Sequence, residues 1–292
     1  MIDRLRTGDL DGQLLIADNG LGEATLRGLR GRGAGIVPMG RNRGFGAAVN
    51  RAARAADGET LVVLNDDLTP GAGFLSALAE PVAKGAAMTA GVLLQSDNPH
   101  LIESAGIEVD ATLGAHDYLR DESVDVLDQP LRPPLGPCGG AAAYRLEAFR
   151  SVGGFDEGFF AYFEDLDLAL RLRAEGAFCA FARRARAVHA GSATLGRGSL
   201  EKASMVGFSR GYLLRKYGVL SAPVPGALAV AQEAAVSLVL ARRHRSLAPA
   251  RARMLGWRTC RVRAPRPVGD AVTVGVGDGL RRRYSRASRA RL

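Results

Sequence analysis

Short apolar runs alternate along the first hundred residues with segments whose apolar positions have helical spacing. Four runs have the composition and the abrupt ends of buried strands, at residues 14–17, 36–37, 61–64 and 88–94. Three segments between them have the spacing of amphipathic helices, at residues 23–32, 45–56 and 74–83. This alternation predicts an α/β fold with a mostly parallel central sheet and helices on both faces.

The chain changes character further on. Residues 100–134 are more polar and predict a long loop. The regular elements expected from there on are a hairpin near 107–113 and helices at 147–152 and 165–175. Pro223 and Pro225 mark a boundary. We therefore expect a first domain over residues 1–222, followed over residues 223–292 by an apolar helix and a basic, arginine-rich tail.

The composition is that of a folded protein, since 47% of the 292 residues are hydrophobic. The three cysteines are far apart, which excludes a disulfide scaffold and favours a reducing compartment, so we expect a cytoplasmic protein. The net charge of +9 is unevenly distributed: residues 241–292 contain 15 arginines and two aspartates, a net +13, which leaves −4 for residues 1–240. A basic tail on a mildly acidic body suits an anionic surface.

A cluster of polar residues, Asn65, Asp66 and Asp67, directly follows the apolar run 61–64. In sheets of this kind, ligands bind beyond the carboxyl ends of the strands. Carboxylates at that position can hold Mg²⁺ or Mn²⁺ while substrate phosphates complete the coordination. A solvated turn or a helix cap before Pro70 explains the same residues, and the spacing alone leaves both interpretations open.

Acidic residues also surround two aromatic pairs, at residues 159–160 and 162–163. An acid held among aromatic side chains is partly desolvated, its pKa rises, and it can act as a general base. Acids at the start of a helix also favour the positive end of its dipole, and this explanation stays open. His189 becomes a candidate metal ligand only if the fold brings it close to Asp67.

The sequence lacks the short motifs of several other enzyme classes. Gly44-Phe45-Gly46 opens a helix and could approach a phosphate, but its spacing fits neither the dinucleotide fingerprint nor the P-loop. There is no cysteine pair or H-E-x-x-H motif for zinc, and no G-x-S-x-G motif of an α/β-hydrolase.

Six motifs occur in a recognisable order: ADNG (17–20), GRNRGFGAAVN (40–50), LNDD (64–67), IESAG (102–106), GGFDEGFFAYFEDLDLALR (153–171) and VHAGSAT (188–194). In this order they resemble the family 2 glycosyltransferases of the GT-A fold, and most of all their bacterial rhamnosyltransferase-like branch. The resemblance runs from about residue 14 to residue 217, and the block over 153–171 is its most specific part.

The resemblance implies a role for each matching residue. Asp165 would be the catalytic base, and Glu164 would shape the acceptor pocket. Asp67 and His189 would bind the Mg²⁺ or Mn²⁺ that bridges the donor diphosphate. The donor-binding residues would be Asp18, Asn19, Asn42, Gly44, Asn50, Asp66, Gly139 and Gly140.

The implied reaction is an inverting transfer of a sugar from a nucleotide diphosphate to a hydroxyl group. The resemblance favours dTDP-rhamnose as donor, with UDP-sugars next, and a glycan or lipid-linked acceptor in cell-envelope polysaccharide synthesis. One alternative is a degenerate, non-catalytic member of the fold that binds a sugar or a partner. Another is a nucleotidyltransferase, which would need a glycine-rich pyrophosphate loop with a basic residue, and the sequence shows none.

The sequence departs from the family pattern near its start. Family members begin with an apolar strand and a helix, whereas here ADNG already begins at residue 17, so we expect the first, central strand to be missing. A sheet without a central strand exposes unpaired backbone edges, which favours a start codon placed too late over a truncated protein. Residues 20–23 also replace the usual Ser and Asp of the base-binding turn.

The region beyond Pro225 contains one apolar helix. Its apolar face would be formed by Leu228, Ala231, Ala235, Leu238 and Val239, with arginines directly after it. This predicts a helix that lies on an anionic membrane surface, at the inner face of the cell membrane, with Trp257 as an interfacial residue. The run over 227–241 is too short and too polar to span a bilayer. A core-packing helix with a solvated tail is the alternative, and the few aromatic residues of the tail argue against nucleic acid as a partner.

Overall fold

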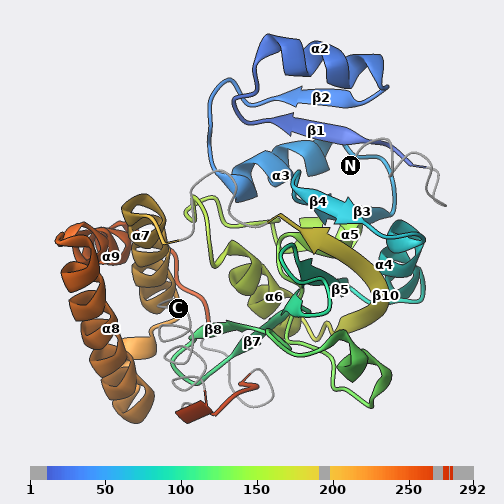
Figure 1. Ribbon diagram of the computed structural model, residues 1–292. Helices are drawn as coiled ribbons and strands as arrows, with labels where there is room; N and C mark the ends of the chain where they lie inside the picture. Colours follow the sequence, from blue (N-terminus) through green and yellow to red (C-terminus); the bar gives the residue numbers. More distant parts are fainter. Residues whose placement is uncertain (1–11, 191–197, 266–271, 276, 279–292) are drawn as a thin grey trace. The chain divides into compact units, whose positions relative to one another are not determined.

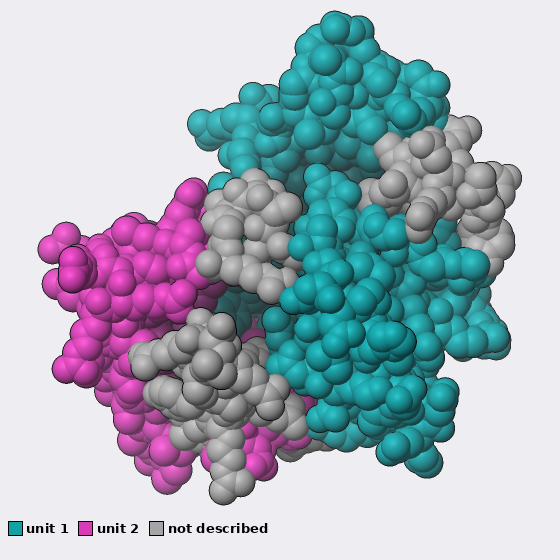
Figure 2. Space-filling view, viewed as in Figure 1, with its two compact units in different colours: residues 1–106, 118–193 teal, residues 107–117, 194–292 magenta. Residues whose placement is uncertain are grey.

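The computed structural model describes residues 12–190, 198–265, 272–275 and 277–278. The expectations for residues 1–11, for residues 191–194 of the last motif and for the arginines over 279–292 lie outside the described residues. The chain forms two compact units, unit 1 (residues 1–106 and 118–193) and unit 2 (residues 107–117 and 194–292), which Figure 2 shows in different colours.

Unit 1 begins with a small parallel sheet. Strands β1 (Leu15–Asp18) and β2 (Gly35–Pro38) pair in parallel, and helix α2 (Glu23–Gly31) connects them. Helix α3 (Phe45–Ala55) packs against both strands (Figure 1). In the described part of the chain, β1 and β2 hydrogen-bond to no other strand, so they form a sheet of their own. The expected absence of a first, central strand stays a prediction.

The main sheet of unit 1 contains β3 (Thr60–Leu64), β4 (Leu68–Pro70), β5 (Met88–Gln95), β6 (Ile102–Ser104), β9 (Ala141–Arg145) and β10 (Cys179–His189). Their order is β3-β9-β5-β10-β4, and β6 pairs with β5. Among these described strands, only β5 and β10 pair in parallel. The predicted mostly parallel sheet is therefore wrong, because β9 enters antiparallel between β3 and β5. An apolar run indicates a strand but says nothing about its direction.

Helices cover both faces of the main sheet, as predicted. Helix α4 (Phe74–Ala83) lies on one face, where Leu78 shares a core cluster with Ala141 and Ala143. Helices α5 (Leu146–Ser151) and α6 (Glu164–Ala174) belong to the other core, where Leu168 clusters with Ala142. Successive residues of β9 thus face opposite cores, as the two-residue period of a strand requires. The short 3₁₀ helix η1 (Val124–Asp128) closes a third cluster around Ile102.

The helices and strands that the sequence predicts in unit 1 are confirmed to within one residue at each end. Four strands were not predicted: β4, β6, β9 and β10. In β10, buried Ala182, Ala185 and Ala187 alternate irregularly with arginines, and a bulge interrupts the register. Small residues and arginines conceal the strand because β-branched and aromatic residues are the usual signal. The three cysteines, all within the described residues, form no disulfide.

Unit 2 combines a β-hairpin with helices. The predicted hairpin is confirmed as β7 (Ile107–Val109) and β8 (Ala115–Asp117). The helices are α7 (Leu200–Lys216), the 3₁₀ helix η2 (Val219–Ser221), α8 (Pro223–His244) and α9 (Ala248–Thr259). Helices α7 and α9 pack so closely that a Cβ on Gly211 would collide with the carbonyl oxygen of Arg253. Because α7 belongs with α9, the predicted boundary at residue 222 falls inside this unit.

Helix α8 turns its polar residues inward and its apolar residues outward. Glu233 is buried and forms an ion pair of 2.7 Å with Arg210 of α7, and Gln232 accepts a hydrogen bond from Thr112 of the hairpin. As far as Leu240, the exposed large side chains of the helix are apolar: Val224, Leu228, Val230, Leu238 and Val239. This is the reverse of the pattern of a helix that faces water.

Helix α8 is also longer than the sequence indicated. It has 22 residues, and its most apolar window has a mean hydropathy of 1.6, so by length and composition it could cross a membrane. The prediction that this segment is too short and too polar to span is therefore wrong. The structure extends the helix at both ends of the run over 227–241, from Pro223 to His244.

Candidate active site

Asp67 and His189 lie together at an edge of the main sheet of unit 1. Strands β4 and β10 pair antiparallel with His189 opposite Leu68, and the Ala190 N–H donates to the Asp67 carbonyl oxygen at 3.1 Å. This pairing brings His189 Nε2 to 3.1 Å from Asp67 Oδ1. His189 was expected to be a candidate metal ligand only if the fold brings it close to Asp67, and the structure does so.

Glu103 contacts His189 as well, although no role was predicted for it from the sequence. Its Oε2 lies 2.9 Å from Nδ1 of His189, on the opposite side of the imidazole ring from Asp67. The hydrogen bond with Glu103 raises the pKa of His189, and Asp67 adds to the effect, while burial opposes it. The sequence contained one signal for Glu103: it is the acidic residue of the IESAG motif, between Ile102 and Ser104.

The pair of Asp67 and His189 fits a divalent cation. Asp67 Oδ1 is buried and accepts no hydrogen bond of normal geometry from the described residues. Two cis ligands at ~2.1 Å from a six-coordinate Mg²⁺ are ~3 Å apart, which is close to the 3.1 Å between His189 Nε2 and Asp67 Oδ1. The described residues contain no group of three or more His, Cys, Asp or Glu side chains that could hold a metal. A cation here would therefore depend on oxygen ligands from substrate and water.

Asp165 stands at the start of α6 with its carboxylate held by backbone groups. Oδ2 accepts a hydrogen bond from the Gly139 N–H at 3.0 Å, and Oδ1 accepts one from the Leu166 N–H at 2.8 Å. The two residues before α6, Tyr162 and Phe163, have φ angles of 68° and 69°. Left-handed backbone at two successive aromatic residues is strained, and such strain is found where a site imposes a particular geometry.

Glu164, the neighbour of Asp165, has a different environment. Its side chain is buried, and Oε2 has no hydrogen-bond partner among the described residues. Burial raises the pKa of Glu164 to about 8, with further contributions from the charges of Asp165 and Asp167. At neutral pH it is therefore mostly a neutral acid, which can donate a hydrogen bond.

Gly139 and Gly140 connect the carboxylate of Asp165 to the acidic turn after β3. Gly139 donates to Asp165, and the carbonyl oxygen of Gly140 accepts the backbone N–H of Asn65 at 3.1 Å. Two residues further along, Asp67 meets His189. Backbone hydrogen bonds thus link Asp165, the two glycines and the turn that carries Asp67 within unit 1. Asp66 is exposed to solvent.

Three of the predicted donor-binding side chains shape the turns at the carboxyl ends of β1 and β2. Asp18 Oδ1 accepts the N–H groups of Gly20 and Leu21. Asn19 donates to the Gly44 carbonyl oxygen at 3.2 Å and accepts the Arg43 N–H at 2.8 Å. Asn42 accepts the Gly44 N–H at 2.9 Å. These bonds hold the loop before α3 against the turn after β1.

Gly44 is required by its position. Its φ is 90°, and a Cβ would collide with the carbonyl oxygen of Phe160, which accepts the Phe45 N–H at 3.0 Å. Asn50 is buried and engaged by its own unit: it donates to the Phe155 carbonyl oxygen and to Glu157, and accepts the Phe155 N–H. We therefore expect Asn50 to act on a donor only by holding the segment before α6.

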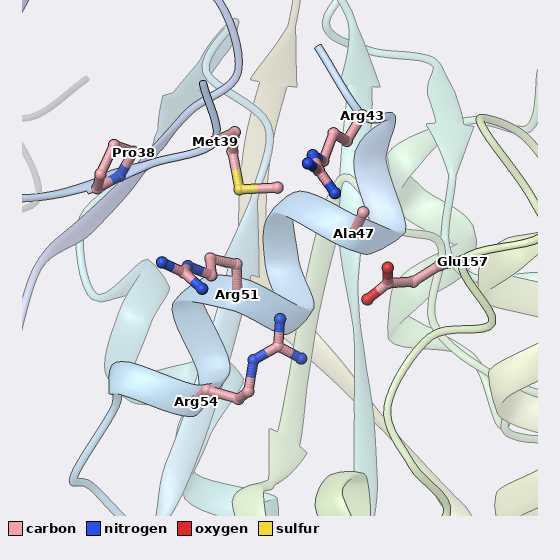
Figure 3. A pocket seen from close by; sticks show the side chains of 7 residues that line it. All are labelled: Pro38, Met39, Arg43, Ala47, Arg51, Arg54 and Glu157. Carbon is pink, nitrogen blue, oxygen red and sulfur yellow. The ribbon is translucent and has the colours of Figure 1, made fainter. Parts of the chain in front are cut away.

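A small pocket of about 210 Å³ lies beside α3. Figure 3 shows the side chains of Arg43, Arg51 and Arg54 on α3 and the loop before it, with the carboxylate of Glu157 turned toward the helix. Pro38, Met39 and Ala47 complete the lining. None of these three arginines forms an ion pair with another described residue, so the pocket is cationic and suits an anionic group.

The fold is that of the GT-A glycosyltransferases. Residues 8–153, half of the chain, match the family model described as glycosyl transferase family 2. The chain belongs to this family, and the resemblance that the motifs indicated is confirmed. It is a glycosyltransferase by family and by fold.

Similar proteins agree with this assignment. The chain is 28% identical over 213 residues to N-acetylglucosaminyl-diphospho-decaprenol L-rhamnosyltransferase of two Mycobacterium tuberculosis strains, covering 63% of this chain and 68% of the relative. A mannosyltransferase from Pyrobaculum calidifontis, solved with GDP-Man and Mn²⁺, aligns over 100% of this chain and 75% of its own, with a TM-score of 0.53 and 17% identity. GalNAc-T7, solved with UDP, GalNAc and Mn²⁺, aligns over 70% of this chain at a TM-score of 0.54 and 15% identity, and this chain spans 42% of its length. At these identities the solved structures show the fold alone.

Proposed function

We propose that this chain is an inverting, metal-assisted glycosyltransferase that moves a sugar from a nucleotide diphosphate to a hydroxyl group. The observation that carries the proposal is the continuity of the site: Asp165 is tied through Gly139 and Gly140 to the turn whose Asp67 faces His189. Such a reaction needs a base for the acceptor hydroxyl and positive charge near the leaving diphosphate, and Asp165 and the pair of Asp67 and His189 would supply them.

Asp165 acts as the general base. It takes the proton of the acceptor hydroxyl as the acceptor oxygen forms a bond to the anomeric carbon. The bond from that carbon to the diphosphate oxygen breaks on the opposite side, which inverts the configuration. The backbone N–H groups of Gly139 and Leu166 fix the carboxylate for this step. Asp67 and His189 would hold a divalent cation, whose positive charge would stabilise the leaving diphosphate.

Glu164 contributes as a neutral acid beside the base. A hydrogen bond that it donates can orient an acceptor hydroxyl or support the carboxylate of Asp165, which fits the expected role in shaping the acceptor pocket. Some residues of the donor site would contact the donor, and others, such as Asn50, would hold the backbone around it. The residues that we assign to this site are Asp18, Asn19, Asn42, Gly44, Asn50, Asp66, Gly139 and Gly140. The cationic pocket beside α3 adjoins the loop of Asn42 and Gly44 and favours an anionic donor.

The relatives suggest the substrate class. The mycobacterial relative is named as a rhamnosyltransferase that acts on a diphospho-decaprenol-linked sugar, and both solved structures contain a nucleotide or nucleotide sugar with Mn²⁺. We propose dTDP-rhamnose as the first donor to test and UDP-sugars next. The acceptor is a glycan or lipid-linked sugar of cell-envelope polysaccharide synthesis.

A lipid-linked acceptor would bring the enzyme to a membrane, and α8 has a surface for one. Its exposed side chains are apolar over most of its length, whereas Arg242, Arg243 and Arg245 follow at its end and are exposed or at the surface. Apolar residues next to arginines are the composition of helices that lie in an anionic bilayer interface. We propose peripheral binding of the cytoplasmic protein to the inner face of the cell membrane.

The function is tested by a panel of nucleotide sugars with Mn²⁺ and a lipid-linked acceptor. Asp165→Asn should remove most turnover, by ~10²–10⁴-fold, while it leaves donor binding intact. Asp57→Asn, at an exposed loop position outside the site, is the matched control. Unchanged turnover in Asp165→Asn would refute the assignment of the base. Donor binding without turnover by any donor would favour the non-catalytic alternative.

Membrane binding is tested by sedimentation with vesicles that contain anionic lipid. The full chain should sediment with them, and Leu238→Glu should reduce the bound fraction because it places a charge on the exposed apolar face of α8. Phe178→Glu changes an equally exposed apolar residue outside unit 2 and should sediment like the unmodified chain. Equal sedimentation of all three proteins would overturn the proposal.

A further inference from the structure

His189 has a carboxylate at each of its two ring nitrogens. Nε2 faces Asp67 Oδ1 at 3.1 Å, and Nδ1 is hydrogen-bonded to Glu103 Oε2 at 2.9 Å. The three side chains are 14%, 23% and 16% exposed for His189, Asp67 and Glu103. At this degree of burial, few water molecules can hydrogen-bond to the imidazole ring. Its two carboxylate neighbours therefore determine which nitrogen carries a proton.

The position of Glu103 is determined by the sheet. Strand β5 lies between β6 and β10, and its Leu94 pairs with Ile102 on one side and with Val188 on the other. Glu103 and His189 therefore reach each other across the end of β5. The neighbours of Glu103 in β6, Ile102 and Ser104, are buried, so the backbone that carries this carboxylate is fixed.

The chemical consequence follows from the two forms of neutral imidazole. An ionised carboxylate can only accept a hydrogen bond, so in the neutral ring Glu103 favours the proton on Nδ1, whereas Asp67, at the longer distance, favours it on Nε2; we infer that Glu103 prevails. The lone pair is then on Nε2, which faces Asp67. Without Glu103, the proton can move to Nε2, whose N–H then donates to Asp67, and Nε2 has no lone pair left for a cation. Outer carboxylates of this kind typically change metal affinity by 10–100-fold.

We propose that Glu103 is the positioning residue of the metal site, which holds His189 in the Nδ1–H form and aims its Nε2 lone pair at the cation bound by Asp67. The inference rests on the proposed metal-assisted function, and it names a residue that the motif resemblance left without a role. Glu103 touches neither substrate nor cation, and acts through His189.

Two measurements on the full chain test this role. The first is the affinity for Mn²⁺, with and without UDP, from the electron paramagnetic resonance signal of free Mn²⁺. Glu103→Ala should weaken binding by roughly 10–100-fold. Glu103→Gln, whose amide oxygen can still accept the Nδ1 proton, should lose less. Glu122→Ala, an exposed glutamate of the following loop, should bind like the unmodified chain.

The second measurement is the ¹⁵N spectrum of the histidine rings without metal, at a pH where imidazole is neutral. The resonances of His189 should report the Nδ1–H form in the unmodified chain and a shift toward Nε2–H in Glu103→Ala. A purely structural ion pair would change the unfolding midpoint without this shift. If the unmodified chain binds Mn²⁺ and Glu103→Ala binds it equally well with the same ring form, the inference is wrong. If the unmodified chain binds no Mn²⁺, the proposed metal site fails, and the ring form alone decides whether Glu103 positions His189.

Discussion

As the pH rises, Glu164→Gln should become increasingly stable relative to the unmodified protein. Glu164 is 7% exposed, and its pKa is raised from 4.5 to about 8 by burial and by the charges of Asp165 and Asp167. The folded state therefore holds this proton more tightly than the unfolded chain does. Its stabilising effect is complete below the unfolded pKa and is lost as the pH rises through the folded pKa.

The magnitude follows from the two pKa values. Each pH unit within this window costs about 1.4 kcal/mol, so the free energy of unfolding of the unmodified protein should fall by about 3 kcal/mol between about pH 5 and pH 8 through this group alone. Glu164→Gln has a similar shape and no charge at any pH. Its buried amide lacks a full set of partners, but that cost is independent of pH and cancels when two pH values are compared.

Urea unfolding of both proteins at about pH 5 and pH 8 measures the effect. The difference in unfolding free energy between Glu164→Gln and the unmodified chain should grow by about 3 kcal/mol toward the higher pH. Glu175→Gln, at the exposed end of the same helix, should show no such growth. An equal difference at both pH values would show that Glu164 ionises normally, and its role as a neutral acid beside Asp165 would have to be abandoned.

Three further predictions concern the supports of the site and of unit 2. Asn50→Ala should lower the free energy of unfolding, measured with urea, by about 2–4 kcal/mol, because it removes the buried partners of the Phe155 N–H and carbonyl groups. Asn98→Ala, on an exposed turn, should change this free energy little. Gly211→Ala should lower the thermal midpoint because its methyl group meets the backbone of α9, while Gly28→Ala on the exposed face of α2 should be neutral or stabilising by about 0.5–1 kcal/mol. Chelation of divalent cations should abolish turnover, added Mn²⁺ should restore it, and turnover unaffected by a chelator would contradict the assignment of Asp67 and His189.

The sequence by itself determined most of the local structure and the identity of the family. Apolar runs and helical spacing located the helices of unit 1 and the strands β1, β2, β3 and β5 to within one residue, because these patterns depend on neighbours a few positions apart. Six motifs between residues 17 and 194 indicated the family by their joint order, and the block over 153–171 was the most specific of them. Two of the four strands that the sequence missed, β9 and β10, consist largely of alanine and arginine, whose burial depends on what packs above them.

Only the tertiary structure decided how these parts meet. The antiparallel entry of β9, the pairing that places His189 opposite Leu68, and the reach of Glu103 across β5 all join residues far apart in the chain. The polar residues of α8 likewise face inward because they contact Arg210 and Thr112, which are distant in the sequence. Strand direction, register and the partner of a buried charge depend on long-range backbone pairing and desolvation. A local pattern of hydrophobic and polar residues does not carry that information.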